Sequence, residues 1–139
     1  MSDPLVVGAE LPPVVRRARP DHISVFSGYP LRHNVHTDEA FAQERGLPGV
    51  IMEGLQLYCY VHDMLLRAFG EMWFHGGKLE LAFLKVVTVG DTLTTGARVR
   101  TVEVGGDETS VTCDVWCKNQ QGDTVAAGMA TGKLKVSAS

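Results

Sequence analysis

The sequence has no cluster of positive charge, and this absence argues against one broad class of partner. Thirteen Lys and Arg residues stand against sixteen Asp and Glu residues in a chain of 139, which gives a formal net charge of -3. Binding to nucleic acid phosphates requires clustered Lys and Arg side chains. The densest group is Arg16, Arg17 and Arg19, which is typical of a solvated face. We therefore expect no nucleic acid partner.

The chain also lacks a long apolar run and a secretory leader. No stretch approaches the roughly 20 apolar residues that a membrane-spanning helix needs. Residues 1–7 have neither the basic start nor the apolar centre of a signal peptide. We therefore expect a cytoplasmic protein that does not associate with membranes.

Cysteine is scarce, and its spacing argues against a metal site. Cys59, Cys113 and Cys117 form no Cys-x-x-Cys motif, and their number is odd. Zinc would need further ligands nearby, so we expect no metal but buried, reduced thiols in a reducing compartment. The chain also has no glycine-rich phosphate-binding loop, and we expect no bound cofactor.

The composition is that of an ordinary globular domain. Hydrophobic residues make up 45% of the chain and charged residues 21%, which suits one domain with one core. Residues 1–20 hold four of the six prolines, so they predict an extended N-terminal arm with at most a short edge strand at 5–7. Residues 22–26 predict another short strand.

Two helices are expected before residue 70, where the spacing of apolar residues changes from helical to strand-like. Residues 37–46 predict a short helix that Thr37 caps, with acidic residues in its first turn and Gly46 at its end. From Glu53 to Phe69 apolar residues recur with helical spacing. This pattern predicts a central helix that is buried over most of its circumference.

Everything after the central helix favours strands. Residues 78–89, 91–104, 109–119 and 124–136 are rich in β-branched residues, and glycine-containing turns separate the last three segments. We expect successive antiparallel strands. The predicted fold class is α+β, with a sheet of about five antiparallel strands wrapped around one long central helix, and residues 1–139 form a single domain.

Residues that can carry acid and base chemistry gather just before the central helix. His33 and His36 are three residues apart and can act as a base and its electrostatic partner. Alternatively, His36 is a hydrogen-bonded histidine at a strand-to-helix junction and His33 lies in an exposed loop. Asp38 and Glu39 are most simply first-turn acids of the short helix. Glu53 adjoins apolar residues, where burial would raise its pKa, or it is an acid at a helix N-terminus.

Three segments together resemble the MaoC-like branch of the hotdog fold, whose members include the R-specific enoyl-CoA hydratases. They are residues 36–42, residues 51–55 at the start of the central helix, and residues 81–93. The resemblance implies hydration or dehydration of an enoyl or 3-hydroxyacyl thioester, carried on coenzyme A or on a carrier protein. It places His36 at the family's catalytic histidine. It also implies that Gly54, next to Leu55, binds the thioester carbonyl through the backbone.

The chain departs from the family where a catalytic aspartate is usual. In the family's Asp-x-Asn-Pro-x-His pattern, Leu31 stands at the aspartate position, His33 at the asparagine and Asn34 at the proline. Glu53 stands where many members have a histidine. A hydratase without its aspartate needs another carboxylate, and Glu53 is the best placed because it adjoins Gly54.

Two other functions fit the same pattern. One is a thioesterase or decarboxylase on the same fold, with His36 or Glu53 moving the proton. The other is a noncatalytic subunit that pairs with a partner carrying an intact Asp and His. For the chain itself we expect a homodimer or a dimer of dimers, because a lone sheet of this size has open edges that can pair across a two-fold axis.

Overall fold

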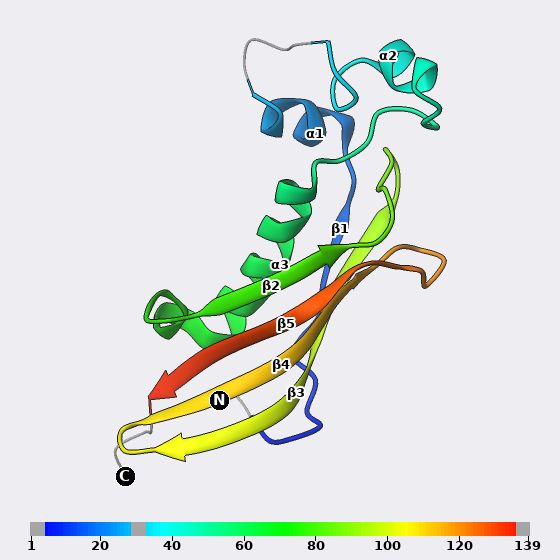
Figure 1. Cartoon of the computed structure of the whole chain (residues 1–139). Helices are drawn as coiled ribbons and strands as arrows, with labels where there is room; N and C mark the ends of the chain where they lie inside the picture. Colours follow the sequence, from blue (N-terminus) through cyan, green and yellow to red (C-terminus); the bar gives the residue numbers. More distant parts are fainter. Residues whose placement is uncertain (1–4, 29–32, 136–139) are drawn as a thin grey trace.

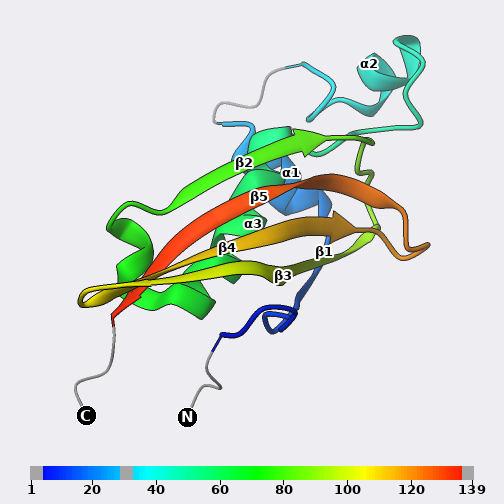
Figure 2. The same ribbon diagram turned by 60° about the horizontal axis from the view of Figure 1, so that its bottom comes forward.

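The sheet curves around one long helix, as the sequence predicts (Figures 1 and 2). The computed structural model describes residues 5–28 and 33–135. Their elements are β1 (Val14–Arg17), α1 (Pro20–Phe26), α2 (Glu39–Glu44), α3 (Gly54–Phe69), the 3-10 helix η1 (Gly70–Phe74), β2 (Lys78–Phe83), β3 (Thr92–Gly105), β4 (Glu108–Lys118) and β5 (Thr124–Lys135). The five strands are ordered β1-β3-β4-β5-β2, and every pairing is antiparallel. This is the α+β hotdog arrangement.

The concave face of the sheet holds the core. Along β4, Val111, Cys113, Val115 and Cys117 are buried, which is the alternation that the sequence predicts. Burial raises the pKa of the Cys113 thiol to about 11 and that of Cys117 to about 12. Both thiols are therefore protonated and unreactive at neutral pH.

Helix α3 lies across this face and presents a regular apolar stripe to it. Leu57, Val61 and Leu65 are buried at helical spacing. A Cβ added to Gly132 of β5 would lie 2.8 Å from the Phe69 ring, so this glycine lets the end of α3 approach the sheet. The opposite face is more open than the sequence predicts, since Leu55 is 61% exposed.

Three predicted strands differ from the structure. Residues 22–26 form most of helix α1, because Pro20 occupies its first turn and fixes a helical φ. The strand of the N-terminal arm lies at Val14–Arg17, on the edge of β3, and not at residues 5–7. Strand β2 ends at Phe83, because the amides of Leu84 and Lys85 both donate to Val125 O.

These short elements gather where α3 begins. Helices α1 and α2 lie beyond the end of the sheet, on the side from which the chain enters α3 (Figure 1). The isolated bridge between Ile51 and Thr88 ties this region to the segment after β2. In the described part of the chain, no helix is long and apolar enough to cross a membrane.

The middle of α3 contains a histidine whose protonation state is fixed by a neighbouring indole. Trp73 Nε1 donates to His62 Nδ1 at 3.0 Å, and the Tyr58 ring meets the His62 ring edge-on with 4.6 Å between centroids. A protonated imidazole has no free acceptor, so this hydrogen bond requires neutral His62. Burial also lowers the pKa of His62.

We expect acid to destabilise the protein partly through His62. Its pKa is lowered in the folded state, so the unfolded chain takes up the proton first, and stability is lost as the pH falls through the unfolded value near 6.5. The free energy of unfolding by urea should therefore fall between pH 7.5 and pH 5.5. In His62→Asn an amide oxygen can still accept from Trp73, so this variant should lose less. An equal loss in both proteins would contradict the assignment.

Candidate active site

A pocket of about 340 Å³ lies between the start of α3 and the end of β2. Its polar lining comes from His36, Glu53 and Lys85, and the backbone of Gly54 borders it. The remaining lining is apolar: Ile51, Met52, Leu57, Phe83, Leu84, Val86 and Val87. The structure thus places Gly54 at the first position of α3 and in the same pocket as His36, as the sequence predicts.

His36 is held by the backbone of one residue. Its ring Nδ1 lies 2.8 Å from Ile51 O, and the Ile51 amide donates to Val35 O at 3.0 Å. A carbonyl oxygen only accepts, so Nδ1 carries the proton. In the neutral ring Nε2 is then unprotonated, which is the form that a general base needs.

The loop before His36 is organised by an asparagine to which the sequence analysis gave no role. Asn34 Oδ1 accepts from the His36 amide at 2.8 Å, and Thr37 Oγ1 accepts from the Asn34 amide at 3.2 Å. Asn34 Nδ2 also reaches Ser27 Oγ at 3.4 Å. Asparagine commonly bonds the backbone two residues further on, and that spacing was the signal available in the sequence. Asn34 therefore positions His36.

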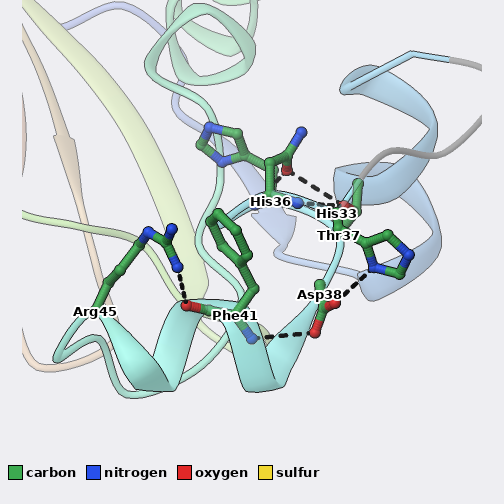
Figure 3. Close-up of polar contacts among 7 residues, drawn as sticks. His33, His36, Thr37, Asp38, Phe41 and Arg45 are labelled. Atoms are coloured by element: carbon green, nitrogen blue, oxygen red, sulfur yellow. Dashed lines mark hydrogen bonds and ion pairs between the residues drawn. The ribbon is translucent and has the colours of Figure 1, made fainter.

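His33 lies apart from this pocket. Its ring is 88% exposed, and Nδ1 donates to Asp38 Oδ2 at 2.7 Å (Figure 3). Asp38 in turn caps α2 by accepting from the Phe41 amide at 3.1 Å, so the cap is Asp38 and not Thr37. The Phe41 amide and then the His33 ring lower the pKa of Asp38. The two histidines thus serve different parts of the loop.

The three carboxylates near His36 have different surroundings. Asp38 is engaged as the α2 cap. Glu39 contributes to a separate cavity of about 510 Å³ on the side of α1 and Thr88. Glu53 alone of the three lines the pocket that contains His36. It is the N-cap residue of α3, only partly buried, and its side chain makes no capping hydrogen bond.

The start of α3 leaves two backbone donors free. The amides of Gly54 and Leu55 precede the first possible intrahelical acceptor, and they have no acceptor among the described residues. The helix dipole adds partial positive charge at this end. Gly54 lines the pocket, whereas Leu55, the other residue predicted to bind the carbonyl, does not. This arrangement suits a carbonyl oxygen on which negative charge develops.

The sequence did not predict the apolar side of the pocket at the end of β2, because residues 78–89 were expected to form one continuous strand. Phe83, Leu84 and Val86 are all about half exposed at the pocket. The side chain of Lys85 lies 3.3 Å from Asp123 on the β4–β5 turn. In the described residues, no group of three or more His, Cys, Asp or Glu side chains is arranged to hold a metal ion.

The fold and the pocket together define a hotdog protein with a largely apolar pocket at the start of its central helix. The model of the MaoC like domain family matches residues 16–121. Because this match covers more than half of the chain, the protein belongs to the MaoC-like domain family. No curated protein matches the sequence.

Solved structures agree on the fold. The MaoC-like dehydratase from Rhodospirillum rubrum superposes with a TM-score of 0.80 at 21% identity, over 97% of this chain and 96% of that one. The (R)-hydratase from A. caviae, involved in PHA biosynthesis, gives 0.77 at 23%, over 96% and 99%. One chain of the ChsH1-ChsH2 complex from Mycobacterium tuberculosis gives 0.71 at 22%, over 95% and 98%. The position of Leu31 lies outside the described residues.

Proposed function

We propose that the protein hydrates or dehydrates an acyl thioester of the enoyl or 3-hydroxyacyl type, on coenzyme A or on a carrier protein. One observation carries this proposal. One largely apolar pocket is lined both by His36, whose Nδ1 is bonded to Ile51 O, and by Gly54, whose amide has no acceptor among the described residues. Membership of the MaoC-like family supports the same class of reaction.

The reaction needs a proton acceptor, a proton donor and an oxyanion site. In the dehydration direction, a base removes the C2 proton of a 3-hydroxyacyl thioester, and the enolate oxygen accepts hydrogen bonds from the Gly54 and Leu55 amides. The C3–O bond then breaks as the hydroxyl takes a proton, and water leaves. Hydration is the reverse: water adds at C3 and a proton returns to C2.

His36 and Glu53 would divide the two proton transfers. Leu31 cannot transfer a proton, and Glu53 is the one described carboxylate that lines the pocket with His36. We propose His36 as the base toward the substrate and Glu53 as the second acid or base. The His33 ring bonds Asp38 away from the pocket. His33 would then stabilise the loop and take no part in proton transfer.

A panel of thioesters tests the reaction directly. The purified protein is incubated with enoyl, 3-hydroxyacyl and saturated acyl thioesters, and the products are read by mass spectrometry. Gain or loss of one water supports the proposal. Release of a free acid would indicate a thioesterase, and loss of carbon dioxide from a carboxylated acyl group would indicate a decarboxylase.

The sequence also favours a second candidate, a noncatalytic subunit. Leu31 removes the aspartate that the family pattern expects, and structural neighbours include the ChsH1-ChsH2 and HadBC complexes. In this case the pure protein would leave every thioester unchanged. Turnover would require a hotdog partner whose Asp and His are intact.

We further propose that residues 1–139 form one hotdog domain in the cytoplasm, with residues 1–20 as its arm. The proposed arm is supported by its pairing with the edge of the sheet. The Gly8 and Leu11 amides donate to carbonyls of β3, and β1 pairs with the same edge of β3. The buried, protonated thiols of Cys113 and Cys117 suit a reducing compartment.

We expect a homodimer or a dimer of dimers in solution. Among the residues that the structure describes, β2 pairs only with β5, which leaves its other edge unpaired there. Leu66 on α3 is 36% exposed. Light scattering at micromolar concentration should give at least twice the 15.1 kDa of one chain. Leu66→Glu should weaken this association, whereas Val104→Glu, on the remote β3–β4 hairpin, should not. A 15.1 kDa species alone would contradict the proposal.

A further inference from the structure

The ring of Phe83 covers the first residue of α3. A Cβ built on Gly54 would lie 3.0, 3.1 and 3.2 Å from three carbons of this ring. Phe83 lines the same pocket as His36 and is 51% exposed, so part of its ring surface remains free. Glycine at position 54 therefore leaves room for an aromatic ring directly beside a free amide.

The backbone beneath the ring is fixed. Phe83 is the last paired residue of β2 and lies opposite Ala126 of β5. The next amide, that of Leu84, donates to Val125 O at 2.8 Å. The ring can therefore turn about its side-chain bonds, but its Cα cannot move away from α3 without loss of these contacts.

This placement constrains what can bind at the Gly54 amide. A carbonyl oxygen that accepts from an amide lies about 2.9 Å from the nitrogen, and the Phe83 ring already fills the space where a side chain at position 54 would begin. The carbon next to that carbonyl, C2 of an acyl thioester, would then lie against the ring. An unbranched C2 presents only hydrogen to the ring, whereas a methyl branch directed toward the ring needs the space that the ring fills.

We propose that Phe83 is a specificity-determining residue that selects acyl thioesters unbranched at C2. The inference rests on the proposed function insofar as the Gly54 amide binds the thioester carbonyl. It goes beyond that function because it names the acyl groups that the pocket accepts. One methyl group in a closely packed pocket is worth about tenfold or more in selectivity.

The test compares straight and branched ligands on four proteins. Wild type, Phe83→Ala, Phe83→Leu and the control Phe74→Ala are assayed with crotonyl-CoA and 2-methylcrotonyl-CoA. Binding of butyryl-CoA and 2-methylbutyryl-CoA is measured by calorimetry on the same proteins. Phe74 is a matched control because it is 72% exposed and lies in η1, away from this pocket.

We expect wild type and Phe74→Ala to prefer the unbranched ligand by about tenfold or more. Phe83→Ala should reduce this preference to within about threefold, and Phe83→Leu should lie between. An unchanged preference in Phe83→Ala, or no preference in wild type, overturns the inference even if hydration is observed. If no protein turns over substrate but the binding preference is present and depends on Phe83, the inference stands and the proposed reaction fails. If no thioester binds, both fail.

Discussion

Replacement of His36 by Ala is expected to reduce thioester hydration by about 10²-fold or more, the usual contribution of a positioned acid or base. The group that is lost is Nε2, the nitrogen available to accept a proton, because Nδ1 is already committed to Ile51 O at 2.8 Å. Steady-state rates with an enoyl thioester measure the effect. The loss should appear mainly in kcat.

A second variant separates chemistry from loop structure. In His36→Asn the side-chain amide nitrogen can occupy the place of Nδ1 and donate to Ile51 O, but no base remains. This variant should be as inactive as His36→Ala while it unfolds closer to wild type. His33→Asn is the control, since that ring is exposed and lies outside the pocket. Full activity in His36→Asn would exclude His36 as the base.

Replacement of Glu53 by Gln is also expected to lower activity by about 10²-fold or more if this residue is the second acid or base. Gln keeps the size of the side chain and removes its proton chemistry. Glu39→Gln is the matched control, because Glu39 borders the other cavity. Asp38→Asn should mainly weaken α2, which Asp38 caps.

The two replacements together decide among mechanisms. If Glu53→Gln retains full turnover and His36→Ala abolishes it, one histidine performs both proton transfers. If neither variant differs from an active wild type, the pocket at α3 is not the catalytic site. If wild type itself converts no thioester, the noncatalytic subunit becomes the better description.

The regular elements could be predicted because their patterns depend on one buried face. Val111, Cys113 and Val115 alternate with polar residues on β4, and Leu57, Val61 and Leu65 recur at helical spacing on α3. Each pattern arises because one face of the strand or helix packs against the core. The fold class follows from the order of these elements and from the family resemblance.

The irregular region could not be predicted, because its contacts join residues distant in sequence. Residues 22–26 alternate weakly, and the influence of Pro20 outweighs that pattern. Asp38 and Thr37 are both good caps, and only the observed loop shows that Asp38 is used. The contact of Phe83 with Gly54 spans 29 positions, so local spacing carried no sign of it.

The hydrogen bonds of two consecutive residues join separate parts of the pocket. Ile51 bonds Val35 and His36 of the loop, and the next amide, that of Met52, donates to Val87 O at 2.9 Å. Opening of any one of these segments therefore removes support from the other two, so they behave as one cooperative unit of local unfolding. The apolar residues after β2 and the His36 side chain would therefore lose or retain their positions together. A substitution in the segment after β2 can thus increase the mobility of the His36 side chain.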